Sequence, residues 1–181
     1  MTTKNFNDEY YINKAIKLAN IAAENGDIPV GCLIVYNENK KNKKMCEVAR
    51  GVKLAKDNIV ATAYNKRNKD KNAICHAEIL AISKACKKFK DFRLEECTMY
   101  VTLEPCQMCA GAIVQSRIKK LVIGTKSQKS GSCGSIINIL DNNEFNHKVE
   151  VVFLDDDKCK NTIKDFFKKV RKGQVSISKG E

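Results

Sequence analysis

This 181-residue chain lacks any long apolar run. No segment approaches the roughly 18 consecutive apolar residues of a membrane-spanning helix. Its first residues, Met-Thr-Thr-Lys-Asn-Phe-Asn-Asp-Glu, include no apolar core of a secretory signal peptide. We therefore expect an intracellular protein, cytoplasmic or nuclear, without a membrane partner. In such a compartment the nine cysteines are expected to be free thiols rather than disulfides.

The chain also lacks a linker-like segment that would divide it. Its hydrophobic content of 43% suits one substantial core, so we expect a single domain over residues 1–172 and a disordered tail over 173–181. Residues 37–57 are rich in lysine and asparagine and are predicted to form a surface insertion. This insertion could contact RNA, or its charges could simply be solvated.

Basic residues exceed acidic ones, 33 to 21, which gives a net charge of +12. Such an excess suits a polyanionic partner such as a nucleic acid, but it also suits a solvated lysine-rich surface. The same alternatives apply to the helix predicted over residues 157–172, whose basic row includes Lys160, Lys164 and Lys168. Its opposite side is predicted to be buried, through Ile163, Phe166, Phe167 and Val170.

The segment 98–111 combines a strand with two thiols at the start of a helix. Residues 98–103 are mostly β-branched, aromatic or aliphatic, which predicts a buried strand, and Pro105 suits the first turn of a helix. Cys106 and Cys109 then lie on one helix face, near the positive end of the helix dipole, where thiolates are favoured. By itself, this Cys-x-x-Cys spacing fits a redox pair, half of a structural zinc site or two small core residues.

The chain has only two histidines, and one of them begins a second helix. His76 and Glu78 precede apolar residues at helical spacing, namely Ile79, Ile82, Cys86 and Phe89. One imidazole and two thiolates would give zinc three protein ligands and leave a position for water, as in catalytic sites. Glu78 is then the candidate for moving protons. Alternatively, Glu78 only complements the helix dipole and His76 is a surface residue.

The pattern His76-x-Glu78 with Pro105-Cys106-x-x-Cys109 is the signature of the zinc deaminases, so its chemical meaning is taken from that family. Beyond the signature, residues 100–112 and the sequence Ser-Arg-Ile at 116–118 resemble the tRNA-specific adenosine deaminases. The resemblance includes both the bacterial enzymes and the catalytic subunit of the eukaryotic enzyme, within the cytidine deaminase-like superfamily. It covers nearly the whole chain, from about Tyr10 to Phe167.

The resemblance implies hydrolytic deamination of adenosine to inosine at the wobble position of tRNA anticodons. It implies one Zn²⁺ per chain, held by His76, Cys106 and Cys109, with Glu78 as the catalytic residue and a zinc-activated water as the nucleophile. It also places Asn65 beside the substrate base, although from the residues alone an asparagine that ends a strand is a turn former.

The fold class predicted is α/β, with three layers and a five-stranded mixed sheet between helices. This fold prediction rests partly on the order of strand 98–103, helix 106–117 and strand 121–123. Such a βαβ unit has parallel strands and a right-handed crossover connection. The resemblance supplies the rest. The other expected elements are a helix at 7–25 ended by Gly26, and strands at 32–36, 58–64 and 148–154.

The resemblance further implies a dimer. The bacterial enzymes are homodimers, whereas the eukaryotic enzyme pairs a catalytic subunit with one that has lost the glutamate. This chain retains Glu78 and is expected to be catalytic. Ser127 stands where the bacterial enzyme has an aspartate, and residues 132–135 look more like the eukaryotic subunit. His147 is interpreted as structural or as a dimer-interface residue.

Two alternatives share parts of this pattern. A deaminase of a free base or nucleotide, of the guanine or cytosine type, would have the same zinc core but would leave the basic final helix unexplained. A noncatalytic RNA-binding subunit would use zinc only structurally. Glu78 argues against that second alternative, because a structural site has no use for a proton carrier.

Overall fold

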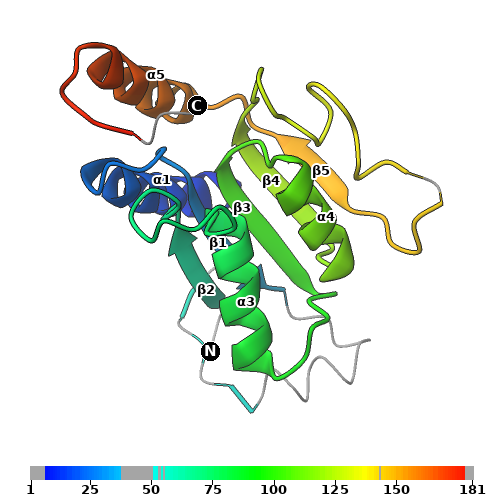
Figure 1. Ribbon diagram of the computed structural model, residues 1–181. Coiled ribbons are helices and arrows are strands. Elements are labelled where there is room, and N and C mark those ends of the chain that lie inside the picture. Colours follow the sequence, from blue (N-terminus) through cyan, green and yellow to red (C-terminus); the bar gives the residue numbers. More distant parts are fainter. Residues whose placement is uncertain (1–6, 38–50, 53, 55, 143, 178–181) are drawn as a thin grey trace.

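The computed structural model describes residues 7–37, 51–52, 54, 56–142 and 144–177. Most of the insertion expected at 37–57, and residues 178–181 of the expected tail, therefore lie outside the described residues. In chain order the elements are α1 (Asp8–Glu24), β1 (Gly31–Tyr36), β2 (Ile59–Tyr64), α3 (Ala77–Phe89), β3 (Cys97–Leu103), α4 (Gln107–Gln115), β4 (Lys120–Thr125), β5 (Glu150–Phe153) and α5 (Asp157–Arg171), as Figure 1 shows.

The five strands form one mixed sheet in the order β2-β1-β3-β4-β5. β1 is antiparallel to β2 and to β3, whereas β3, β4 and β5 are mutually parallel. The parallel unit expected from strand 98–103 to strand 121–123 is thus confirmed. Because only β1 is reversed, the carboxyl ends of the other four strands lie at one edge of the sheet. The predicted five-stranded mixed sheet is confirmed.

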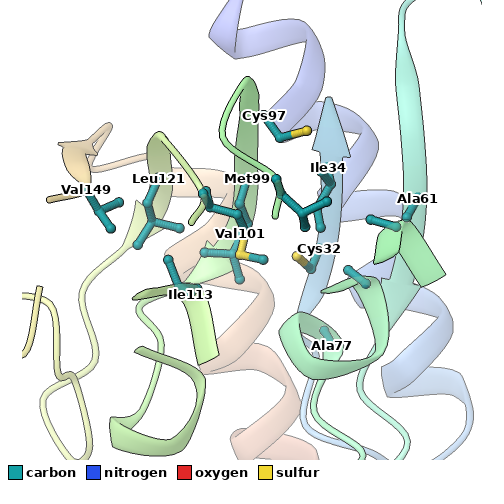
Figure 2. Packing of buried hydrophobic residues seen from close by; sticks show 14 of the residues in the cluster. Cys32, Ile34, Ala61, Ala77, Cys97, Met99, Val101, Ile113, Leu121 and Val149 are labelled. Atoms are coloured by element: carbon teal, nitrogen blue, oxygen red, sulfur yellow. The ribbon is translucent and has the colours of Figure 1, made fainter. Parts of the chain in front are cut away.

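Helices cover both faces of the sheet, with α1 and α5 on one face and α3 and α4 on the other (Figure 1). All six residues of β1 are buried, and they alternate between the two faces. Leu33 and Val35 pack against α1, while Cys32 and Ile34 belong to the larger core under α3 and α4 (Figure 2). Burying each large aliphatic side chain stabilises the fold by about 1.5–3 kcal/mol.

α1 begins and ends close to its predicted bounds of 7–25. The Asn7 side chain caps its start by accepting a hydrogen bond of 3.0 Å from the amide of Tyr10. Gly26 ends it with a φ of +74°, a conformation that glycine adopts at little cost. At Gly31, a Cβ would overlap the carbonyl oxygen of Ala15 and lie 2.7 Å from the amide nitrogen of Ala19. The missing side chain therefore lets α1 pack closely on β1.

The buried face of α3 differs from the predicted one. The sequence favoured Ile79, Ile82 and Cys86 as core residues, but these are only half-buried. Of the predicted residues only Phe89 is buried, and the rest of the core face is formed by Ala77, Ala81 and Ala85. Small alanine side chains let the helix approach the sheet closely, and the larger residues then flank the contact. Hydrophobic spacing identified the helix and the side on which Ile82 and Cys86 pack against the core, but not the alanines at the centre of the buried face.

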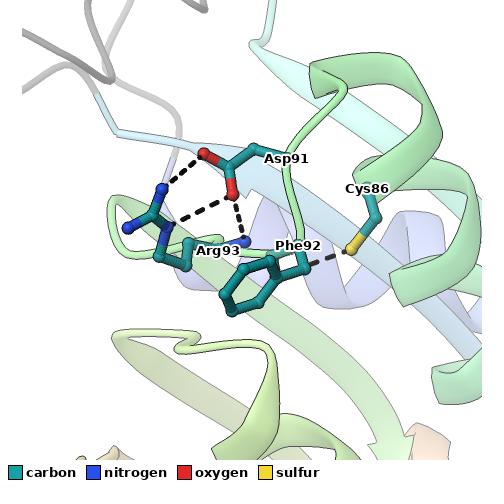
Figure 3. Close-up of polar contacts among 4 residues, drawn as sticks. All are labelled: Cys86, Asp91, Phe92 and Arg93. Atoms are coloured by element: carbon teal, nitrogen blue, oxygen red, sulfur yellow. Dashed lines mark hydrogen bonds and ion pairs between the residues drawn. The ribbon is translucent and has the colours of Figure 1, made fainter.

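A compact turn follows α3. Lys90 ends the helix in the left-handed conformation, with a φ of 54°. Asp91 then accepts hydrogen bonds from the backbone and the side chain of Arg93, while the Cys86 thiol lies 3.7 Å from the carbonyl oxygen of Phe92 (Figure 3). These contacts fix the path from α3 towards β3, although the Phe92 side chain itself is exposed.

α5 has nearly the predicted bounds, and the Asp156 side chain caps its start by accepting a 2.8 Å hydrogen bond from the amide of Cys159. The prediction of its buried side is confirmed in part. Phe166 is buried, but Ile163, Phe167 and Val170 are only half-buried. The close contact with the sheet is made instead by Cys159, which lies over Gly124 of β4 where a side chain would not fit. The rest of α5 extends beyond the sheet.

Two lysines of α3 reach the outer strand β2. Lys84 Nζ lies 2.7 Å from the carbonyl oxygen of Thr62, and Lys88 Nζ lies 3.2 Å from that of Val60. β2 is one of the two outer strands of the sheet, so these ammonium groups occupy hydrogen-bond acceptors of an edge strand.

The eight cysteines within the described residues are free thiols, as predicted. Within the same residues, no helix has the length and apolarity that a membrane crossing needs.

Candidate active site

The topology brings several segments together at one edge of the sheet. Asn65 directly follows β2, Cys106 follows β3 after two residues, and the loop that contains Lys129 follows β4. The helices α3 and α4 also begin at this edge. A pocket of about 490 Å³ lies between these segments, a size that suits a small organic ligand. Its lining comprises Ile28, Val30, Asn65, Arg67, Ala73, His76, Glu78, Leu103, Glu104, Cys106, Gln107, Met108, Lys129, Ser130 and Phe167.

Three metal-ligand side chains from two helix starts meet beside this pocket. His76 occupies the N-cap position of α3, and Cys106 occupies that of α4. His76 Nδ1 lies 3.6 Å from Cys109 Sγ and 3.7 Å from Cys106 Sγ. The three donor atoms all lie within 4.8 Å of one another, and no fourth Cys, His, Asp or Glu of the described residues joins them.

These distances fit a tetrahedral zinc ion. With Zn–S bonds of about 2.3 Å and Zn–N bonds of about 2.0 Å, tetrahedral geometry separates neighbouring donor atoms by roughly 3.5–3.8 Å. The two sulfur–nitrogen distances of 3.6 and 3.7 Å lie within this range. One imidazole and two thiols are also donors that zinc prefers. The cluster can therefore hold zinc with three protein ligands.

The two thiols differ in acidity. The pKa of Cys106 is lowered to about 4, mainly because its sulfur accepts a hydrogen bond from Cys109, while His76 adds a smaller effect in the same direction. The pKa of Cys109 is raised, because its proton is held in that hydrogen bond and because the residue is buried. The pair thus offers one thiolate readily, and a bound cation would favour loss of the second proton.

Glu78 lines the pocket from the first turn of α3. Only 4% of its surface is exposed, and burial raises the pKa of its carboxyl group. A carboxylate that only complemented the helix dipole would lie in solvent, whereas Glu78 is enclosed next to the three donor side chains. Its raised pKa suits a group that accepts a proton and releases it again.

Asn65 lines the pocket and holds a buried hydrogen-bond acceptor that is unused. Its Nδ2 atom lies 3.3 Å from the carbonyl oxygen of Ile28, and its backbone amide donates a 2.9 Å hydrogen bond to Val30. Its Oδ1 atom is buried and has no partner among the described residues. A ligand N–H group in the pocket could satisfy this oxygen.

Several pocket residues were not anticipated from the sequence. Arg67 follows the carboxyl end of β2, a position that indicates a ligand-binding edge. Phe167 was predicted to be core, yet it lines the pocket, with Lys129 Nζ 5.9 Å from the centre of its ring. No sequence signal distinguished Phe167 from its buried neighbour Phe166.

The loop that carries Arg67 is held by a buried aspartate. Asp27 is only 1% exposed and accepts hydrogen bonds of 2.5 and 3.0 Å from the amides of Asn68 and Lys69. The Asn68 side chain donates in return to the carbonyl oxygen of Gly26. These contacts give this side of the pocket a fixed backbone.

The second histidine lies apart from the donor cluster. His147 Nε2 is 2.7 Å from the carbonyl oxygen of Ile118, so the ring donates this hydrogen bond in its Nε2–H form. The contact connects the segment before β5 to the turn between α4 and β4, which fits a structural role.

Comparison with known protein families matches residues 6–171 to the MafB19-like deaminase family. The chain is 39% identical to the tRNA-specific adenosine deaminase of Bacillus subtilis over 173 residues, which are 95% of this chain and 96% of that protein. It is 35% identical to the tRNA-specific adenosine deaminase of Aquifex aeolicus over 163 residues, covering 90% and 95% of the two chains.

Solved structures give a consistent result. A structure from work on A-to-I editing by tRNA:A34 deaminases at the wobble position of transfer RNA has a TM-score of 0.71 and 26% identity, covering 85% of this chain and 99% of that one. The guanine deaminase of Bacillus subtilis is similar to a lesser extent, with a TM-score of 0.54 and 29% identity, covering 67% of this chain and 66% of that one.

Proposed function

Since this chain belongs to the tRNA-specific adenosine deaminases, within the MafB19-like deaminase family, we propose that it converts adenosine to inosine at the wobble position of tRNA anticodons. The observation that carries the proposal is the meeting of His76, Cys106 and Cys109 beside Glu78 in one pocket. The identity of 39% and 35% to two tRNA-specific adenosine deaminases extends over 95% and 90% of this chain, which favours the tRNA enzyme over a deaminase of free bases.

In this proposal His76, Cys106 and Cys109 hold one Zn²⁺ per chain. When bound, zinc supplies a water molecule whose pKa is lowered to about 7, so that it can act as a nucleophile at neutral pH. The remaining chemistry is carried by the side chains around the pocket.

Glu78 is the proposed proton carrier. Deamination consumes one water and releases one ammonia, so protons must move from the water to a ring nitrogen and to the departing amino group. Glu78 accepts one proton from the water and passes it to the ring nitrogen. It then carries the second water proton, from the hydroxyl group added at C6, to the leaving amino group, which departs as ammonia. Its burial beside the donor cluster and its raised pKa support this assignment.

Asn65 is proposed to bind the base. Its buried Oδ1 atom can accept a hydrogen bond from an N–H of the purine, as asparagine does when it recognises adenine in other settings. Bases in single-stranded RNA loops can be turned out of the stack and enter such a pocket. Arg67 and Lys129 add positive charge at the pocket for the neighbouring phosphates.

We further propose that the chain acts as the catalytic member of a dimer, because it retains Glu78. Two arrangements follow from the family: a homodimer, or a pair with a noncatalytic relative. The mass of the assembly isolated from its own cell distinguishes them. A strictly monomeric active protein would contradict both.

The direct test is to incubate the purified protein with an anticodon stem-loop that carries a wobble adenosine and to measure inosine. A candidate partner subunit is added in a parallel reaction. Glu78→Ala should abolish turnover while zinc stays near one ion per chain, because Glu78 is not part of the donor cluster. Absence of inosine in both reactions, with rapid deamination of free guanine or cytosine, would favour the alternative enzyme. Loss of zinc in Glu78→Ala would show that Glu78 is a ligand.

A further inference from the structure

Glu104 joins the strand that precedes a zinc-ligand candidate to a loop of the pocket wall. It follows the last residue of β3 and stands two residues before Cys106. Only 3% of its surface is exposed. Although it belongs to the resemblance segment 100–112, neither the metal cluster nor the proposed proton transfers use its carboxylate.

All hydrogen bonds found for this carboxylate come from one loop, residues 127–135, here called the serine loop. Oε1 accepts 3.0 Å hydrogen bonds from the backbone amides of Cys133 and Ser135. Oε2 accepts a 3.0 Å hydrogen bond from the amide of Ser127 and a short one from the hydroxyl of Ser135. Each carboxylate oxygen thus has two donors.

Among the described residues, no lysine, arginine or histidine forms an ion pair with Glu104. The buried charge is compensated by three N–H groups and one hydroxyl, which are strong donors to an ionised acceptor. Moving the serine loop away would leave a buried charge without partners, and such a state is costly. The position of the loop is therefore energetically tied to the carboxylate.

Close packing strengthens this attachment. A Cβ at Gly131 would overlap the Glu104 carboxylate and lie 2.5 Å from the carbonyl oxygen of Ser127. The amide of Ser132 also donates a 2.9 Å hydrogen bond to the carbonyl oxygen of Pro105. The serine loop thus folds tightly around the segment that leads into Cys106.

The same loop supplies Lys129 and Ser130 to the pocket lining. We propose that Glu104 is a positioning residue, whose carboxylate fixes the serine loop so that Lys129 and Ser130 face the substrate. It acts on binding of the nucleotide rather than on the proton transfers. The identity of that substrate rests on the function proposed above, whereas the anchoring of the loop does not.

The test uses Glu104→Gln, which keeps the shape of the side chain. An amide has one acceptor oxygen, so at most two of the four donors stay satisfied, and its NH₂ group then faces the other two. Ser135→Ala is a milder variant that removes only the hydroxyl donor and leaves the backbone amides in place. Should Glu104→Gln not fold, Ser135→Ala alone carries the test.

Glu96→Gln is the matched control. Glu96 is also a buried glutamate, 6% exposed, but it precedes the opposite end of β3 and pairs with Lys119 at 3.5 Å. It does not line the pocket. It therefore reports the effect of neutralising a buried glutamate that flanks the same strand, away from the serine loop.

The first measurement is hydrogen exchange of the purified proteins without substrate. Glu104→Gln should speed exchange in the serine loop by roughly tenfold or more, because three of its amides bond to the carboxylate. Ser135→Ala should give a smaller increase, and Glu96→Gln none in this loop. Unchanged exchange of the serine loop in both loop-directed variants would overturn the proposal.

The second measurement is kinetic, with the anticodon stem-loop as substrate. Glu104→Gln should raise KM about tenfold and change kcat less than about threefold, with zinc still near one per chain. A fall in kcat with constant KM, or a loss of zinc, would overturn the positioning role. If the wild-type protein forms no inosine, the proposed function fails, and hydrogen exchange still decides whether Glu104 anchors the loop.

Discussion

The side chain of Asn65 offers a test in which stability and activity should respond differently. We consider Asn65→Ala. The variant loses one long hydrogen bond, 3.3 Å, from Nδ2 to the carbonyl oxygen of Ile28. That oxygen keeps a 2.8 Å hydrogen bond from the amide of Val30, so it is not left without a partner. The lost contact therefore contributes only about 0.5–1.5 kcal/mol to the free energy of unfolding.

The same substitution removes a buried acceptor, Oδ1, that has no partner among the described residues. An unsatisfied buried polar atom costs about 1–3 kcal/mol, so its removal offsets the lost hydrogen bond. The free energy of unfolding of Asn65→Ala should thus stay within about 1 kcal/mol of the wild-type value. Binding of the base should suffer, because the acceptor for its N–H group is gone. A loss of about 1.5–3 kcal/mol corresponds to a fall of roughly 10- to 150-fold in kcat/KM.

Asn37→Ala is a matched control for this experiment. Asn37 also follows a strand, but at the opposite edge of the sheet, where its Nδ2 donates a 2.7 Å hydrogen bond to the hydroxyl of Thr98. Its removal should lower stability by about 0.5–1.5 kcal/mol and leave inosine formation unchanged. Urea unfolding and stem-loop kinetics on the same samples provide both quantities. Strong destabilisation of Asn65→Ala, with a loss of activity only in proportion, would refute the role of Asn65 in binding the base.

Three further predictions concern the metal, pH and packing. Cys109→Ala should lose bound zinc, because only two of the three donors remain. Metal analysis of the purified variant measures this loss, and retention of one zinc per chain would contradict the assignment of Cys109 as a zinc ligand. Burial raises the pKa of Tyr11 to about 12, so the Tyr11 hydroxyl stays protonated in the folded state while it ionises near pH 10 in the unfolded state. The free energy of unfolding should therefore fall between pH 10 and 12. Tyr11→Phe should show a smaller fall over this range in unfolding experiments, and an equal fall would show that other groups cause it. Gly31→Ala should lower the free energy of unfolding by about 1–3 kcal/mol, because α1 leaves no room for a Cβ, whereas Gly111→Ala, which meets open space, should not.

The elements that could be predicted are those whose signals are local. Hydrophobic spacing, capping residues and segment length predict the helix α1, the strand β1 and the parallel β3–α4–β4 unit. The direction that a helix faces depends on its partner. α3 turns its alanines to the sheet because only small residues allow close approach, and no sequence period distinguishes that face from the isoleucines beside it.

The site was predictable to the extent that a motif encodes it. His76, Glu78, Cys106 and Cys109 stand in recognisable spacing. The structure brings the first three into the lining of one pocket and places the buried Cys109 beside His76 and Cys106. The other residues of the pocket wall come together only in the folded chain. Phe167 reaches the pocket only because α5 extends past the sheet. The hydrogen bonds of Glu104 go to a loop 23 to 31 residues away, so the neighbouring sequence carries no signal that predicts them.

Two lysines of α3 bond to the outer strand β2, and this affects how copies of this protein can associate. Lys84 and Lys88 already bond to the carbonyl oxygens of Thr62 and Val60. A foreign β-strand that approached this margin would have to displace two ammonium groups before its own amides could bond to these carbonyl oxygens. Growth of the sheet from chain to chain is therefore discouraged along β2.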